Sequence, residues 1–184
     1  TMDAPDIIAA LETLLPGTGA QALASIDQPA ILVPADRLRD VCVALRDGPA
    51  FRFTALVDIV GVDALPKEPR FEVNYCLVAV DVPARLRIKV RAGGEFPRVP
   101  SVAAVWPAAG FLEREVWDLF GVEFEGHPDM RRLLTPEDWE GHPLRKDYPV
   151  QVDTPVTFAA PTQVTEEQFR ATMEKDRRLR GESR

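Results

Sequence analysis

The sequence is poor in the residues that most often build metal and redox sites. Among 184 residues it has two cysteines and two histidines. An iron–sulfur cluster requires about four thiolates, and a structural zinc requires several Cys or His side chains at close spacing. Cys42 and Cys76 stand far apart, in helix-like and strand-like surroundings, so we expect them to serve as small apolar side chains. The composition therefore predicts neither a cluster nor a disulfide.

Long apolar runs and a basic charge balance are also missing. No apolar stretch approaches the roughly 18 to 20 residues of a membrane-spanning helix, and the first residues lack the basic and apolar regions of a signal peptide. The net charge of -7 disfavours a non-specific nucleic-acid binder, because phosphate neutralisation requires a basic surface. With 46% hydrophobic and 28% charged residues, the chain has the composition of a folded globular protein.

The short motifs of common enzyme classes are absent as well. The sequence contains no GxSxG elbow, no P-loop and no GxGxxG, and neither cysteine has a histidine close to it in the sequence. Glu113 and Glu115 are expected on different sides of one helix, so they do not form a catalytic carboxylate pair. The residues alone therefore predict no active site on this chain.

Helical periodicity is present in three segments, 7–15, 35–47 and 111–120. Proline or glycine follows each of them, as is common after the last turn of a helix. The third segment has an apolar side formed by Leu112, Val116, Leu119 and Phe120. Its charged residues, which we expect on the opposite side, are Glu113, Arg114, Glu115 and Asp118.

Three further segments alternate apolar and polar residues, as half-buried strands do. Their apolar positions are Phe53, Ala55, Val57 and Ile59, then Phe71, Val73, Tyr75 and Leu77, then Leu86, Ile88 and Val90. The connections at 63–69 and 81–83 are too short for crossover helices, so neighbouring strands should run antiparallel. The predicted fold is α+β, with an antiparallel sheet and helices packed on one face.

The third strand carries four cations on one side, at Arg85, Arg87, Lys89 and Arg91. Two interpretations stay open for this side of the strand. It is either a solvated face of the sheet or a docking surface for an acidic partner.

Changes in residue composition and periodicity along the chain predict three regions. We expect an α+β core domain over residues 1–121, a charged loop layer over 122–149 and an extended, loop-rich tail over 150–184. The tail is rich in proline but ends in a helix at about 165–180, which opens with the capping box Thr165-Glu-Glu-Gln168. Its apolar stripe is thin, which leaves two interpretations open. The helix either docks on a partner chain, or it docks back on this chain or frays.

The motif EGHP occurs twice and contains both histidines, His127 and His142. With Glu125 and Glu140 they suggest a metal site, and hence a stand-alone metal-dependent hydrolase as one hypothesis. Histidine ligands on a helix are usually three or four residues apart, which these are not. Each histidine stands between Gly and Pro, a setting typical of turns, so we expect turn residues rather than ligands.

Between Glu113 and Tyr148 the sequence is dense in charged and aromatic residues that interrupt regular structure. Such a stretch suits either a self-locking loop layer or a protein interface. The residues for which we expect one of these two roles are Glu113, Arg114, Glu115, Asp118, His127, Arg131, His142, Arg145, Lys146, Asp147 and Tyr148.

The same stretch resembles a known family. EREVWDLFG, followed by GHPDMRRLLTPEDWEGHPLRKDYP, is similar to the signature of the 30-kDa subunit, also called the C subunit, of the proton-pumping NADH-quinone oxidoreductase, respiratory complex I. The upstream segments LVDIVGVD, RFEVNYCL, RLRIKV and PRVPSV fit this family in the same order. The resemblance covers residues 51–149 well and the remainder loosely.

The resemblance implies a structural role. Members of the family carry no cofactor, whereas FMN and iron–sulfur clusters are bound by partner subunits. It implies packing on the hydrogenase-large-chain-like D subunit, here called the quinone-site subunit because it helps to form the quinone site, and on neighbouring subunits of the peripheral arm. The arm faces the cytoplasm, so the chain would reach the cell membrane only indirectly, through the complex. Related modules in membrane-bound hydrogenases and in quinone oxidoreductases with other electron donors remain an alternative.

Overall fold

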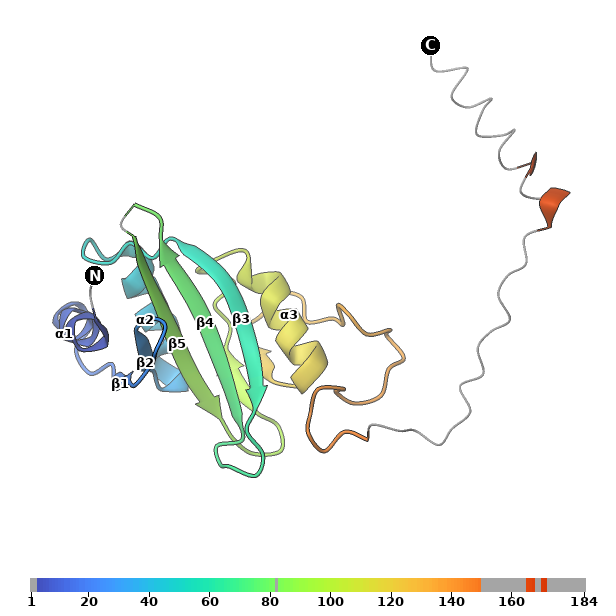
Figure 1. The fold of residues 1–184 in the computed structure, drawn as a ribbon, viewed down its shortest axis with the longest axis horizontal. Helices are drawn as coiled ribbons and strands as arrows, with labels where there is room; N and C mark the ends of the chain where they lie inside the picture. Colours follow the sequence, from blue (N-terminus) through green and yellow to red (C-terminus); the bar gives the residue numbers. More distant parts are fainter. Residues whose placement is uncertain (1–2, 82, 150–164, 168–169, 172–184) are drawn as a thin grey trace, which may run out of the picture. The chain divides into compact units, whose positions relative to one another are not determined.

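The computed structural model describes residues 3–81, 83–149, 165–167 and 170–171 (Figure 1). The chain divides into two compact units, Thr1–Tyr148 and Pro149–Arg184. In the second unit the backbone is helical at 166–167 and at 170–171. The rest of the predicted tail, including most of its expected helix, lies outside the described residues. No helix in the described part of the chain is long and apolar enough to cross a membrane.

A five-stranded sheet forms the centre of the first unit, with the strand order β1-β2-β5-β4-β3. The strands are β1 (Gln21–Leu23), β2 (Ala30–Leu32), β3 (Ala55–Asp63), β4 (Phe71–Ala79) and β5 (Ala84–Ala92). The three long strands pair antiparallel, as predicted. β2 pairs with β5 in parallel, which the short connections between the long strands did not predict.

β3 departs from the predicted alternation at Val57. The register with β4 shifts between Leu56 and Asp58, which marks a β-bulge. Leu56 and Ile59 are buried, whereas Val57 is 60% exposed. The prediction that Val57 faces the core is therefore wrong, because the extra residue in the bulge reverses the alternation.

All three helices lie on the same side of the sheet. They are α1 (Ala4–Leu14), α2 (Leu38–Asp47), which follows a 3-10 turn at Ala35–Arg37, and α3 (Ala109–Phe120). Buried side chains of α2 join those of β4 and β5 in one core, and α3 packs on β3 so closely that a Cβ at Gly61 would meet the Phe120 ring. Figure 1 shows α2 behind the sheet and α3 alongside β3. The predicted α+β fold, with helices on one face, is confirmed.

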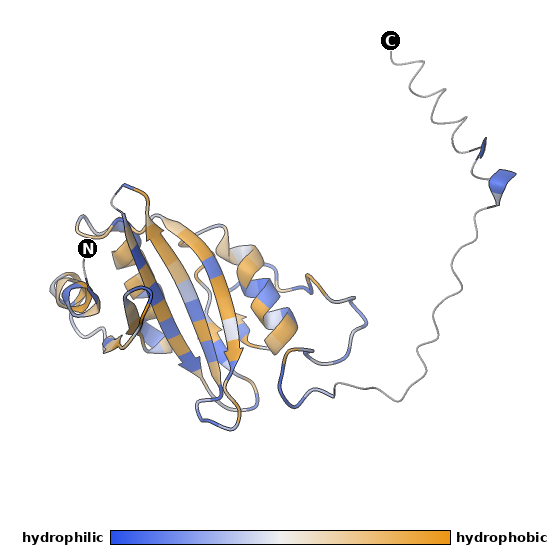
Figure 2. Ribbon diagram, in the orientation of Figure 1, coloured by the Kyte–Doolittle hydropathy of each residue, from blue (hydrophilic) through white to orange (hydrophobic). Residues whose placement is uncertain are grey.

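A second, two-stranded sheet ties together the two ends of α3. β6 (Arg98–Pro100) precedes the helix and β7 (Glu123–Glu125) follows it, and the two strands pair in parallel. Pro97 and Pro100 interrupt the alternation of apolar and polar residues here, so β6 was not predicted. Hydropathy follows this architecture along the long strands, where hydrophobic and hydrophilic positions alternate on β5 (Figure 2).

Candidate functional site: the loop layer on helix α3

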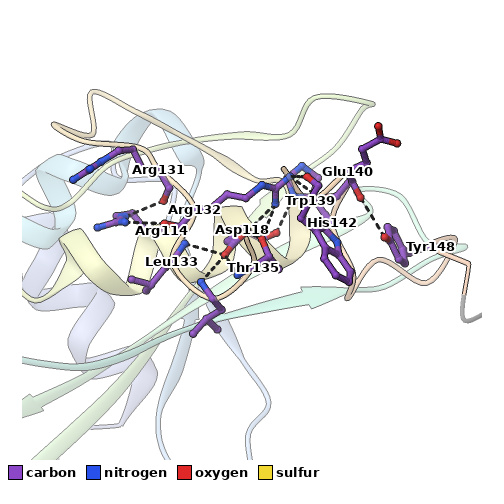
Figure 3. A network of polar contacts seen from close by, with 12 residues as sticks. Arg114, Asp118, Arg131, Arg132, Leu133, Thr135, Trp139, Glu140, His142 and Tyr148 are labelled. Carbon is purple, nitrogen blue, oxygen red and sulfur yellow. Dashed lines mark hydrogen bonds and ion pairs between the residues drawn. The ribbon is translucent and has the colours of Figure 1, made fainter. Parts of the chain in front are cut away.

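The carboxylate of Asp118, on α3, organises the loop layer (Figure 3). Its Oδ2 accepts hydrogen bonds from three consecutive backbone amides, those of Leu133, Leu134 and Thr135, at 3.0, 2.7 and 2.9 Å. Its Oδ1 accepts from the Arg132 guanidinium at 2.8 Å and from the Thr135 hydroxyl at 2.5 Å. The carboxylate is 0% exposed, yet all its lone pairs have donors, so its burial is compensated.

Asp118 is held in its charged form. Burial alone would raise its pKa, but the hydrogen bonds from Thr135, Arg132 and Leu133 outweigh burial and hold the pKa of Asp118 well below its usual range. The helical pattern had placed Asp118 and Glu113 on a charged outer side of α3. Both are buried instead, because the loop layer covers α3 at Asp118 and the β6 end covers it at Glu113.

Two arginines clamp the loop layer to itself and to α3. Arg132 donates to the carbonyls of Trp139 and Gly141 at 2.6 and 3.1 Å, besides pairing with Asp118. Arg114 donates to the carbonyls of Arg131 and Arg132, both at 2.9 Å. Carbonyls in a loop of irregular backbone need such donors. The loop therefore has a defined conformation without a helix or a strand.

The second EGHP motif caps the C-terminal end of α3. The last carbonyls of a helix lack partners within it. Here His142 Nδ1 lies 2.9 Å from the Asp118 carbonyl, the Leu144 amide donates to Leu119 at 3.0 Å, and Arg145 donates to Phe120 at 2.6 Å. Since a carbonyl only accepts, Nδ1 of His142 carries the proton. Burial lowers the pKa of His142, so the ring is neutral at pH 7.

The first EGHP motif binds near the other end of the same helix. Nε2 of His127 lies 2.9 Å from the carbonyl of Gly110, and Nδ1 accepts from the Asp129 amide at 3.0 Å. His127 therefore carries its proton on Nε2, the opposite tautomer to His142. The glycines of both motifs, Gly126 and Gly141, have φ of 80° and 77°, which is the left-handed region that favours glycine. The repeated motif encodes two turns.

The two histidines do not form a joint metal site. They bind carbonyls of residues 110 and 118, which are about 12 Å apart along the helix axis at 1.5 Å per residue. In the described residues no group of three or more His, Cys, Asp or Glu side chains is placed to hold a metal ion. A stand-alone hydrolase built on both histidines would need them to converge on one ion.

Glu113 is the second buried carboxyl of α3. Its Oε2 accepts from the Ser101 hydroxyl at 2.6 Å, and its Oε1 accepts from the Val102 amide at 2.7 Å. Burial raises the pKa of Glu113 to about 7, although these two hydrogen bonds act in the opposite direction. His127 Nε2 lies 3.9 Å from Oε2. Glu113 thus links α3 to the segment that follows β6.

The end of the loop layer is fixed to the β3–β4 connection. Arg70 pairs with Asp63 at 2.7 Å and with Asp147 at 2.6 Å. The Lys146 amide donates to Asp63 at 2.9 Å, and the Lys146 ammonium donates to the Leu65 carbonyl at 3.3 Å. Hydrogen bonds from Arg70 hold the pKa of Asp63 well below its usual range.

Three of the expected site residues make few contacts. Arg131 is exposed and pairs only with Asp129, two positions away, at 2.7 Å. The Tyr148 hydroxyl donates to the Glu140 carbonyl at 3.2 Å. Glu115 is partly exposed, and its carboxylate has no hydrogen bond or ion pair with any other described residue. Among the expected carboxylates of α3, Glu115 alone remains available for a group outside the described chain.

Four important members of this network were not predicted from the sequence: Asp63, Arg70, Arg132 and Thr135. No pattern in the sequence separates Arg132 from its neighbour Arg131, because both lie in irregular backbone. A signal for Thr135 did exist, since Thr-Pro-Glu-Asp is typical of a helix start, but it carried no information about a partner on α3. The structure has a turn at 137–138 in place of that helix.

The loop layer exposes apolar side chains as well as charged ones. The apolar side chains more than one-third exposed are Leu133, Leu134, Trp139 and Leu144. All four lie on irregular backbone in the loop layer. Exposed apolar surfaces on a folded protein mark sites of contact with other proteins.

Comparison of the sequence with known proteins finds one family and relatives that share one name. The model of the family described as "Respiratory-chain NADH dehydrogenase, 30 Kd subunit" matches residues 31–154. A relative from Roseiflexus castenholzii, named as the C subunit of NADH-quinone oxidoreductase, is 42% identical over 149 residues, which is 81% of this chain and 86% of the relative. One of the same name from Thermus thermophilus is 43% identical over 152 residues, 78% and 72% of the two chains.

Two solved structures are similar as well. One is a trypsin-resistant fragment of Nqo5, with 35% identity and a TM-score of 0.54, covering 65% of this chain and 98% of that one. The other is a chain of the membrane-bound sulfane sulfur reductase, an archaeal respiratory membrane complex. It has 30% identity and a TM-score of 0.67, with 79% and 85% coverage.

Proposed function

Because the chain belongs to the family of the 30-kDa subunit of respiratory-chain NADH dehydrogenase, we propose that it is a structural subunit of the NADH-quinone oxidoreductase complex. In this role the chain has no active site and binds no cofactor. FMN and the iron–sulfur clusters that pass electrons from NADH to quinone lie on partner subunits. The chain contributes by holding those partners at fixed positions.

One observation supports this proposal above the others, namely the chemistry of the loop layer. The side chains of Arg132, His142 and Arg145 are bound within the chain, while leucines and a tryptophan are exposed beside the acidic residues Glu137, Asp138 and Glu140. A catalytic loop would direct polar groups toward a substrate, whereas an interface directs apolar and aromatic anchors toward a protein. The loop layer has the second arrangement.

We assign the quinone-site subunit as the partner on the loop layer, with neighbouring peripheral-arm subunits beside it. Glu115 would supply a carboxylate to this contact, because it has no partner among the described residues. The complex would stand on the cytoplasmic face of the cell membrane, and this chain would touch the membrane only through it. Proton translocation would occur in other subunits.

A second candidate rests on the likeness to the sulfane sulfur reductase chain. A related membrane complex with a different electron donor would use the same structural subunit, since the proposed role gives this chain no contact with the donor. The names of the sequence relatives favour the NADH enzyme.

The substitution Leu134→Asp tests the loop layer as an interface. Leu134 is 59% exposed, so the free chain should fold normally. If Leu134 anchors the contact, a charge there should cost about 2 kcal/mol or more of binding, which is roughly thirtyfold in affinity. The measurement is recovery of the quinone-site subunit on the tagged full chain, with circular dichroism of the free chain as the folding check.

Ile26→Asp is the matched control, because Ile26 is fully exposed on a different loop. It should leave the recovery unchanged. Normal recovery of the quinone-site subunit with Leu134→Asp would refute the loop layer as the contact surface.

A further inference from the structure

The five-stranded sheet has a second face, opposite the helices, which we call the open face. The strand registers place the outward residues of β3, β4 and β5 in rows, such as Val60, Asn74 and Lys89, or Val62, Glu72 and Arg91. Every described helix of the first unit packs on the other side. The open face therefore has no cover from the described part of that unit.

On β5 the open face is cationic. Lys89 and Arg91 share one carboxylate, that of Glu72, at 2.8 and 3.4 Å, and Arg87 pairs with Asp27 at 2.8 Å. Arg85 is exposed and has no ion pair within the described residues. Asp58 of β3 also faces outward, in one row with Cys76 and Arg87. Four cations thus face three carboxylates, which leaves an excess of positive charge on a chain whose net charge is -7.

On β3 the open face carries three valines and one carboxylate, that of Asp58. Val60 and Val62 point outward at more than one-third exposure, and Val57 in the bulge is exposed beside them. A solvated sheet face carries polar residues at its outward positions, as β4 and β5 do here with Glu72 and the cations. β3 breaks that rule, and its ribbon is coloured hydrophobic over most of its length in Figure 2. It is also the edge strand of the sheet, where exposed valines invite association.

We propose that the open face is a second protein-docking surface, which receives an acidic, amphipathic segment of a partner subunit. The segment lays apolar side chains over Val57, Val60 and Val62 of β3. Its carboxylates reach Arg85 and the cations beside it on β5. β3 and β5 are two strand spacings apart, so the valines of β3 and the cations of β5 are separated by about 10 Å. This distance matches the diameter of one helix laid along the strands. Charge complementarity selects an acidic segment over a neutral one.

This inference rests on the proposed function in one respect, because it places the chain inside a complex. It uses no residue of the loop layer, so the two proposals fail separately. Leu134→Asp reports on the loop layer, and the variants below report on the open face.

Accessibility of a thiol placed at Val60 tests coverage of the open face. In a Cys76→Ser background, Val60→Cys gives a reporter on β3, while Cys42 is buried and stays unreactive. Val60 is 42% exposed, and Val43, at 39% on α2, is the matched control as Val43→Cys. Maleimide labelling of Val60→Cys should be at least tenfold slower in the purified complex than in the free full chain. Equal rates in the two states would overturn the proposal.

Charge reversal tests the chemistry of the partner. Arg85→Glu breaks no ion pair within the described residues, so the free chain should unfold at the same denaturant concentration as wild type. Lys67→Glu, an exposed lysine in the β3–β4 turn, is the matched control. Arg85→Glu should lower the amount of assembled complex severalfold, and more at low salt than at high salt. Lys67→Glu should not.

Unchanged assembly with Arg85→Glu would overturn the assignment of an acidic protein partner. The full chain is also mixed with vesicles containing anionic lipid. If it binds them in an Arg85-dependent way while assembly is unaffected, the open face contacts a lipid surface and the proposal is wrong. Absence of vesicle binding, together with loss of assembly, supports a protein partner.

Discussion

Replacing Asp118 by Asn gives the sharpest test of how the loop layer is held. The carboxylate accepts five hydrogen bonds, three of them from backbone amides. Asn has the same shape but only one oxygen. Its NH2 group, which cannot accept a hydrogen bond, must replace either Oδ1 or Oδ2 and face the donors there. If it replaces Oδ1, the charge-assisted bond from Arg132 and the bond from Thr135 are lost together. A hydrogen bond to a charged group contributes about 1.5–3 kcal/mol, and the two together about 3 kcal/mol.

Hydrogen exchange measures this loss directly, since the amides of residues 133–135 are the ones that bind Asp118. A loss of about 3 kcal/mol in the free energy of loop opening should speed their exchange roughly a hundredfold. Amides in the centre of β4 should exchange as in wild type. Asp129→Asn is the control, because Asp129 is a same-type residue of the same loop in an exposed pair with Arg131, and it should leave the three amides protected.

The pH dependence supplies a second check on the same pair of proteins. The pKa of Asp118 is lower in the folded chain than in the unfolded one. Its stabilising effect is therefore fully present above the unfolded pKa of about 4 and is lost as pH falls through the folded pKa. The difference in protection between wild type and Asp118→Asn should be constant from pH 7 to about 5 and narrow in stronger acid. Exchange rates that agree within threefold at pH 7 would refute the reasoning.

Two further predictions concern α3 itself. Gly121 ends the helix at φ 72°, and a Cβ there would clash with the His142 ring. Gly17 has a similar φ of 75°, but its Cβ would meet nothing within 4 Å. Gly121→Ala should therefore lower the free energy of unfolding in urea by about 2 kcal/mol more than Gly17→Ala. An equal loss in the two variants would show that the contact is unimportant. Because the pKa of Glu113 is raised to about 7, its burial favours the protonated form, and wild type should lose about 3 kcal/mol of stability relative to Glu113→Gln as pH rises from about 4.5 to 7. Parallel stability curves for these two proteins over that range would contradict it.

The sequence allowed the regular elements to be predicted where periodicity is undisturbed. β4 and β5 alternate along their full length, and the apolar positions predicted for them are buried. β3 could not be assigned in the same way, because Leu56 and Val57 are both apolar and a bulge leaves no mark in such a pattern. The parallel pairing of β2 with β5 joins segments distant in the chain, which short-range patterns do not report.

The loop layer was recognisable as a region but not in its contacts. Its density of charged residues predicted locking or an interface, and the contacts of Arg114, His142 and Arg145 are now visible within the chain. Which of two adjacent arginines faces Asp118 depends on backbone geometry that no local pattern in the sequence reports. The burial of Glu113 likewise depends on β6, a strand that starts beside one proline and ends at another. A role for these residues at an interface stays a prediction.

The cap on α3 also divides unfolding into two steps, the opening of the loop layer and the unfolding of the sheet core. Carbonyls at the end of the helix accept hydrogen bonds from residues more than twenty positions downstream. These bonds join the helix to the loop layer. When the loop layer detaches from the helix, water replaces the donors of His142 and Arg145. Each exchanged hydrogen bond costs only about 1 kcal/mol net. The sheet core needs none of these bonds. A partner bound to the loop layer would stabilise it in the closed state. The degree of order of the loop layer would then differ between the bound chain and the free chain.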